Sequence, residues 1–320
     1  MSGSGYTEPM TKTLKAWLAL LRLPNLFTAP GDPLAGALLA GAALGTSIAW
    51  VPAALGAVAS LCLYACGLVA NDALGADEDA RERPDRPIPS GRISRGAALI
   101  AACLLNACAL LAAALASLPA LGVAVALSAN VWGYNARARA LPGVRPFAMG
   151  ACRGLSLLLG AAAVARGDFA SAPVLIAAVG LTLHVAAITA IASREVGPEG
   201  GVRLPRLVLV SSPVVLLATL AALALVAWQG WSPSLGRVPT GYACGVTAMA
   251  VVWSALWCGL LFGRPGPTAV RSSIAHLVRG ILLVQAAFCA TAGLAGEAVS
   301  LGLLAAFPVA SWVGAWIKGS

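Results

Sequence analysis

The segment 71–91, NDALGADEDARERPDRPIPSG, holds the side chains of this 320-residue chain that are best suited to chemistry. It contains half of the chain's twelve acidic residues, although only 10% of all residues are charged. Asn71 and Asp72 directly follow an apolar run, so we expect them where a membrane helix meets water. On a regular helix, about 100° per residue places Asn71, Gly75 and Asp79 on one face, with Asp72 almost directly below Asp79.

Carboxylate and carboxamide oxygens on one helical face suit Mg²⁺, a hard cation whose shell is often completed by phosphate oxygens. A run of charges is more often a solvated loop. Polar groups placed directly against an apolar span are costly, however, and their position favours a functional role. The segment therefore predicts a Mg²⁺ site for a diphosphate substrate, with Asn71, Asp72 and Asp79 as metal ligands.

Three arginines are candidates for contacting that diphosphate. Arg81 and Arg86 lie in the acidic segment, and their guanidinium forks match phosphate oxygens. Arg153 lies inside the apolar run MGACRGLSLLLG, so it must face a polar cavity or an acid. It either contacts the diphosphate or serves as a structural partner of Asp32 or of the acidic segment. The Pro and Gly neighbours of Asp32 also predict a broken helix there.

Four further polar residues are weaker candidates for the site. Asn25, after Pro24, is expected in the polar wall of a cavity. Tyr134 ends an apolar run and either lines the cavity or is an interfacial anchor. Arg194 is a candidate for substrate binding, and Glu195 beside it is either a further metal ligand or only the surface partner of Arg194.

The elements that position these residues are expected to be membrane helices. Hydrophobic residues make up 59% of the chain, and its mean hydropathy is +0.86, which is too apolar for a water-soluble domain. At about 20 residues per span, the length allows about ten helices. We therefore expect an all-α, polytopic helical bundle that forms a single domain over 1–320, with a flexible segment at 1–11.

Ten apolar runs follow an amphipathic segment at 12–23. They are the residues 25–45, 51–70, 96–116, 118–134, 146–165, 172–193, 205–228, 239–263, 273–294 and 299–317.

The basic residues predict the orientation of these spans. All but three of the 21 Lys and Arg residues, namely Arg153, Arg166 and Arg237, fall on one side of the predicted membrane. This asymmetry places both termini and the acidic segment in the cytoplasm, and we expect a bacterial inner or plasma membrane. The net charge of +9 is therefore interpreted as topology control and not as a sign of nucleic-acid binding.

The order of these motifs resembles the intramembrane UbiA-type prenyltransferases. The resemblance rests on the Asn-Asp pair, a second Asp eight residues after the Asn, and RPDRPIPSG. Supporting motifs are LRLPNLFTAP, YNARA and MGACRGL. The resemblance implies a nine-helix core, here followed by a tenth span, and transfer of a prenyl group from a prenyl diphosphate to a lipid-soluble acceptor with Mg²⁺.

The resemblance also assigns roles to residues. Metal diphosphate is expected at the three ligands proposed above, with Arg81 and Arg153 at the phosphates and Asn25 and Tyr134 lining the cavity. Two departures weaken the expected metal site. Gly75 stands where the family usually has an Asp, and the second acidic motif is reduced to SREVGPEGG. The sequence thus resembles a divergent branch of the family.

Two other functions fit the same sequence. A membrane terpene cyclase needs the same ionising site but no acceptor. A carrier or transporter of polyprenyl lipids would bind the isoprenoid without turnover, and the missing acids favour this alternative.

Overall fold

The computed structural model describes residues 7–137, 141, 143–165, 168–194, 204–228, 240–263 and 265–319. Within these ranges the chain forms helices and turns and no strand. The helices are α1 (Thr7–Leu20), α2 (Leu23–Leu26), α3 (Gly31–Leu44), α4 (Trp50–Leu74), α5 (Ala76–Glu82), α6 (Arg95–Ala116), α7 (Leu118–Ala136), α8 (Arg145–Val164), α9 (Ala172–Ala192), α10 (Arg206–Trp228), α11 (Thr240–Gly259), α12 (Pro267–Ala290) and α13 (Leu294–Gly319).

Each predicted apolar run corresponds to a helix, which confirms the all-α membrane bundle. In the described residues, eight helices are long and apolar enough to cross a membrane: α4, α6 and α8 to α13. Helix α7 matches the fourth predicted run, and the short α3 belongs to the first. Helix α1 begins at Thr7, inside the segment that we expected to be flexible, while residues 1–6 lie outside the described part of the chain.

The first span is broken, as the Pro and Gly residues around Asp32 predict. Helix α2 has only four residues, and a turn over 27–30 separates it from α3. Because α3 has 14 residues, it is about 21 Å long, which is shorter than the apolar thickness of a bilayer. The turn and α2 therefore complete this crossing at the end of the molecule where α4 finishes.

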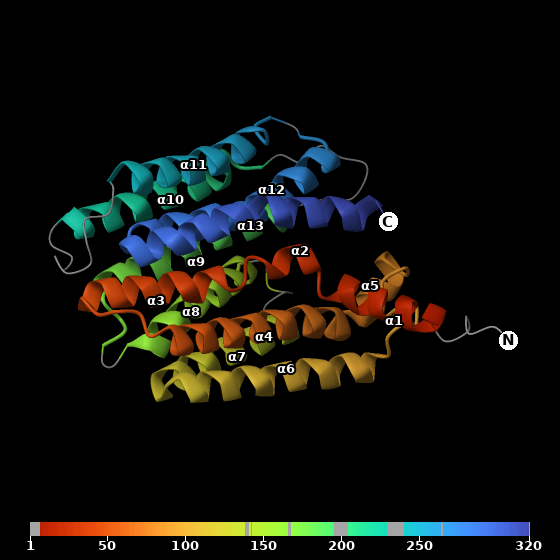
Figure 1. Cartoon of the computed structure of the whole chain (residues 1–320). Helices are drawn as coiled ribbons and strands as arrows, with labels where there is room; N and C mark the ends of the chain where they lie inside the picture. The colour runs from red at the N-terminus through yellow and green to blue at the C-terminus, as the bar shows by residue number, and fades with distance from the viewer. Residues whose placement is uncertain are drawn as a thin grey trace.

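The long helices lie side by side in a bundle, and α8 joins its two halves (Figure 1). Buried residues of α8 belong both to the core formed with α3, α9, α10 and α12 and to the core formed with α4, α6 and α7. Glycines allow α3 and α8 to approach closely. A Cβ at Gly36 would lie 1.9 Å from the carbonyl oxygen of Leu157, and one at Gly160 would lie 1.8 Å from that of Pro33.

Several charged parts of the chain lie at one end of the bundle. Helices α1 and α5 and the C-terminal end of α13 all lie at the right-hand end of Figure 1. Helix α4 also finishes there, so the acidic segment and both ends of the described chain share this end. We call it the basic end, because the segment 81–95, at and after the end of α5, carries Arg81, Arg83, Arg86, Arg92 and Arg95.

Candidate functional site

The acidic segment does not form one continuous helix. Helix α4 ends at Leu74, and α5 begins at Ala76, with Gly75 between them at φ −90° and ψ 5°. The N–H of Gly75 still donates to the carbonyl of Asn71 (3.0 Å), and its own carbonyl accepts from the N–H of Asp79 (2.9 Å). Glycine is a weak helix former, which explains the break.

Despite the break, the two predicted carboxylates meet at one arginine. Nη1 of Arg86 lies 2.7 Å from Oδ2 of Asp79 and 3.5 Å from Oδ1 of Asp72. The same Oδ1 accepts from Nη2 of Arg22 at 2.9 Å and from Nδ2 of Asn71 at 3.1 Å. We call these five residues the mouth cluster.

The acids of the mouth cluster are buried, whereas its arginines reach solvent. Asp72 is 5% exposed and Asp79 is 8% exposed. The side chains of Arg22 and Arg86 are 36% and 26% exposed. A buried carboxylate needs a partner, and here the partly exposed arginines compensate the charge of both acids.

The loop after α5 brings Arg86 back to the acids. Ile88 and Ile93 are buried in the core beneath it and anchor the loop. Gly91 turns the chain at φ 74°, a left-handed conformation that favours glycine. The hydroxyl of Ser94 then accepts from the N–H of Ala97 (3.1 Å) and caps α6.

Other predicted site residues have different surroundings. Arg81 is exposed and donates from Nε to the carbonyl of Asp77 (3.2 Å). Arg194 is exposed at the end of α9, and Glu195 lies outside the described residues. The side chain of Asp77 is 80% exposed and pairs with Arg95 at 3.3 Å, so the break at Gly75 does not turn Asp77 into the mouth cluster.

The two predicted wall residues lie near the broken first span and at the end of α7. Asn25 is half-buried in α2, and its carbonyl accepts from Oγ1 of Thr28 at 2.8 Å. Tyr134 is buried, and its neighbour Asn135 donates to the carbonyl of Gly67 (3.3 Å), which ties α7 to α4.

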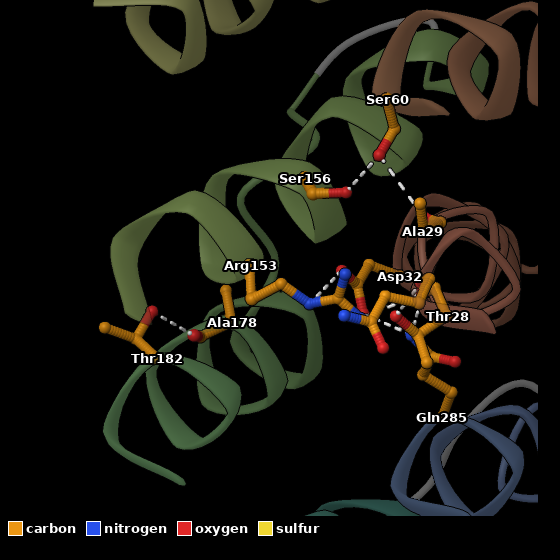
Figure 2. A network of polar contacts seen from close by, with 10 residues as sticks. Thr28, Ala29, Asp32, Ser60, Arg153, Ser156, Ala178, Thr182 and Gln285 are labelled. Atoms are coloured by element: carbon orange, nitrogen blue, oxygen red, sulfur yellow. Dashed lines mark hydrogen bonds and ion pairs between the residues drawn. The ribbon is translucent and has the colours of Figure 1, made fainter. Parts of the chain in front are cut away.

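Arg153 pairs with Asp32, which is one of the two roles that its position allows. Its Nε lies 2.9 Å from Oδ2 of Asp32, and its Nη2 donates to the carbonyl of Thr28 at 2.8 Å. Nε2 of Gln285 donates to Oδ1 of Asp32 (2.5 Å) and to the same carbonyl (2.7 Å). Figure 2 shows these groups converging from α3, α8 and α12. We call these four residues the buried network.

Arg22 and Gln285 belong to these sites but are not among the site residues predicted from the sequence. In the sequence, Arg22 belongs to the amphipathic segment 12–23. Its position two residues before Pro24 and next to the first apolar run is the signal that the sequence offers. Gln285 is a polar residue in the middle of the apolar run ILLVQAAFCA, and a polar group at that depth indicates a specific role.

In the part of the chain that the structure describes, no group of three or more His, Cys, Asp or Glu side chains is placed to hold a metal ion. A cavity of about 310 Å³ lies at the opposite end of the bundle from the mouth cluster and is lined mainly by apolar residues, including Ala42, Ile48, Trp50 and Leu294. It is therefore separate from both polar sites.

Comparison with known families shows to which family the chain belongs. Its residues 33–262 match the UbiA prenyltransferase family. The chain belongs to this family. The matched range contains the acids of the mouth cluster, Arg86 and Arg153, while Arg22 and Asp32 precede it.

Individual members of the UbiA family match less of the sequence. The chain is 34% identical over 143 residues to a digeranylgeranylglyceryl phosphate synthase from Methanothrix thermoacetophila, which is 45% of this chain and 52% of that relative. A protein of the same name from Natronomonas pharaonis is 30% identical over 164 residues, 51% of this chain and 57% of the relative. The chain thus spans about half the length of these curated relatives.

A solved structure of a UbiA homologue confirms the fold over most of the chain. The homologue from Archaeoglobus fulgidus bound to DMAPP and Mg²⁺ has a TM-score of 0.59 and 14% identity. The match covers 84% of this chain and 98% of the homologue. Because the identity is this low, the match shows the fold alone.

Proposed function

We propose that this UbiA family member transfers a prenyl group from a prenyl diphosphate to a lipid-soluble acceptor within the membrane. One observation carries the proposal: two buried carboxylates, Asp72 and Asp79, share a guanidinium at the mouth of an apolar helical bundle. A prenyl diphosphate has a matching form, with a charged head for the mouth cluster and an apolar tail for the bundle. The prenyltransferase family and the relative bound to DMAPP and Mg²⁺ support this assignment.

The donor atoms of the mouth cluster fit one magnesium ion. Nη1 of Arg86 contacts both carboxylates, so a positive group already stands between Asp72 and Asp79. When Arg86 turns towards a phosphate, these carboxylates and the amide oxygen of Asn71 would hold Mg²⁺, with phosphate oxygens completing its shell. The bound ion would neutralise the charge of the departing diphosphate. Glu195 remains a proposed additional ligand.

The arginines supply the remaining positive charge. Arg22 and Arg86 are partly exposed beside the buried acids, so their guanidinium groups are placed to meet phosphate oxygens. Stabilising the diphosphate as its bond to the prenyl carbon breaks lowers the barrier to ionisation. The apolar helices beneath exclude water, so the allylic cation survives until the acceptor attacks it. Arg81 and Arg194, both exposed, remain candidates for guiding the diphosphate to the mouth.

The acceptor is proposed to be lipid-soluble because it must reach the cation within the bilayer. Relatives named digeranylgeranylglyceryl phosphate synthase make a glycerophosphate-type lipid one acceptor to test. Quinones, phenols and sugar alcohols are the others. We further propose that Tyr134 and Asn25 line the path of the isoprenoid, since both lie on elements next to the mouth cluster.

The basic end of the bundle is proposed to face the cytoplasm. The segment 81–95 at this end carries five arginines, and loops rich in Arg and Lys remain on the cytoplasmic side. Both termini and the mouth cluster would then face the cytoplasm, from which a soluble diphosphate head can enter.

The test is a product analysis with purified protein, Mg²⁺ and prenyl diphosphates of ten to twenty carbons, with and without acceptors. We expect a prenylated acceptor and released diphosphate. A cyclic hydrocarbon formed without acceptor would instead identify a terpene cyclase. Binding of the isoprenoid with no release of diphosphate across all chain lengths and acceptors would contradict an enzyme and indicate a carrier.

A further inference from the structure

A series of hydrogen bonds joins the mouth cluster to the turn before α3. Arg22 donates to Asp72 from its side chain, and its carbonyl accepts from the N–H of Asn25 (2.8 Å). The carbonyl of Asn25 accepts from both the N–H (3.1 Å) and the hydroxyl (2.8 Å) of Thr28. Hydrogen bonds therefore run without interruption from Arg22 through Asn25 to Thr28.

The buried network holds Thr28 from the other side. The carbonyl of Thr28 accepts from Arg153 on α8 and from Gln285 on α12, at 2.8 and 2.7 Å. The next carbonyl, of Ala29, accepts from the hydroxyl of Ser60 on α4 at 3.3 Å. Figure 2 shows side chains from three long helices directed at this one turn. The turn is thus hydrogen-bonded to α4, α8 and α12.

Arg22 requires such support because its backbone is strained. It has φ 46° and ψ 57°, and among the described residues it is the one non-glycine residue with positive φ. A left-handed conformation is unfavourable for a residue with a Cβ atom and persists only where the surroundings hold it. Helix α2, with four residues, is too short to be stable alone.

Burying the polar side chains of this network inside a membrane bundle costs free energy, which indicates a role other than stability. Asp32 and Gln285 are 0% exposed and Arg153 is 5% exposed, in the interior of a membrane bundle. A buried ion pair is weak evidence for stability, because desolvation offsets its attraction. Gly31 leaves room for the arrangement, since a Cβ there would lie 2.1 Å from Oε1 of Gln285.

We propose that Arg153, Asp32 and Gln285 are positioning residues for diphosphate binding. They fix the turn between α2 and α3 and thereby hold the guanidinium of Arg22 at the mouth cluster. The identity of the anion rests on the proposed function, whereas the mechanical link rests on the hydrogen bonds alone. Disrupting the buried network should therefore weaken diphosphate binding only if Arg22 contacts the diphosphate.

A double-mutant cycle tests this link. Affinity of the purified full-length chain for inorganic pyrophosphate with Mg²⁺ is measured by calorimetry for the unaltered chain, Arg22→Ala, Gln285→Leu and the double variant. Gln285→Leu should weaken binding about fivefold, the effect expected from losing its hydrogen bond to the carbonyl of Thr28. In the Arg22→Ala background the same substitution should change affinity less than twofold. Equal losses in both backgrounds would overturn the proposal.

Ser212→Ala is the matched control. The hydroxyl of Ser212 is also fully buried and bonds to Ser254 (2.9 Å) and His184 (3.1 Å), and these contacts link α9, α10 and α11 away from the turn. This variant should lose stability but keep its pyrophosphate affinity. A loss of affinity as large as that of Gln285→Leu would show a general effect of destabilisation and overturn the proposal.

Hydrogen exchange supplies a readout that does not depend on a ligand. Amides of residues 22–29 should exchange at least tenfold faster in Gln285→Leu than in Ser212→Ala, and unchanged exchange would overturn the proposal. Faster exchange in a chain that binds no pyrophosphate would support the positioning role and contradict the diphosphate function. If Gln285→Leu does not fold, Gly31→Ala replaces it, because the added methyl would displace the amide of Gln285.

Discussion

At the scale of single residues, burial separates the acids of segment 71–91 into two kinds. Asp72 and Asp79 point inwards and share Arg86, whereas Asp77 is largely exposed and pairs with Arg95. The proposed site for metal diphosphate uses the two buried acids. Gly75 lies between these acids in the sequence, at the position where the resemblance to the family implies a further Asp.

Restoring that acid gives a residue-scale prediction. Gly75→Asp adds a carboxylate one helical turn after Asn71, next to Asp72 and Asp79. We expect the Mg²⁺ concentration for half-maximal diphosphate release to fall about tenfold, because a third carboxylate strengthens the site. Gly75→Asn, which adds similar bulk without charge, is the control. An unchanged Mg²⁺ response in Gly75→Asp would show that the metal lies elsewhere.

The acids and Arg86 are predictable from the sequence because they lie close together in the chain and follow one apolar span. The contact of Arg22 with Asp72 is not, because it joins residues 50 apart through the packing of the broken first span. For Arg153 the sequence leaves three partners open, namely the diphosphate, Asp32 and the acidic segment. The choice of Asp32 depends on how closely α3 and α8 approach, and this follows from side-chain packing rather than from local pattern.

At the scale of elements, the most informative features are the two helix breaks. The break around residues 27–30 is predictable, because Pro and Gly flank an intramembrane acid there. The break at Gly75 differs from the continuous helix that we expected. Helix α5 restarts with Asp77, Glu78 and Asp79 in its first turn, where acids interact favourably with the helix dipole. Both breaks bring charged side chains to the same end of the bundle.

At the scale of the whole molecule, hydropathy predicts nearly all of the architecture. Ten apolar runs become helices because backbone groups in a membrane must be satisfied within each segment. Hydropathy does not predict which helices pack against one another. The central position of α8, between two cores, depends on glycines that allow helices to touch, and their partners lie far away in the sequence.

The orientation of the bundle gives a prediction at this scale. Cysteines placed singly at Ser90 and at Ser47, in a background without other cysteines, should react differently in intact cells. A membrane-impermeant maleimide should label Ser47→Cys, at the far end, and should leave Ser90→Cys, in the loop after α5, unlabelled until the membrane is opened. The reverse pattern would show that the mouth cluster faces outwards.

The most direct test of the central claim is the binding of Mn²⁺, an ion that electron paramagnetic resonance detects, in place of Mg²⁺ and with inorganic pyrophosphate present. If Asp72 and Asp79 hold the metal diphosphate, the unaltered chain should bind the ion, and Asp72→Asn and Asp79→Asn should each bind it at least tenfold more weakly. Asp77→Asn, which alters an exposed acid, should bind as the unaltered chain does. Equal binding by all four proteins would contradict the account, as would binding by none of them.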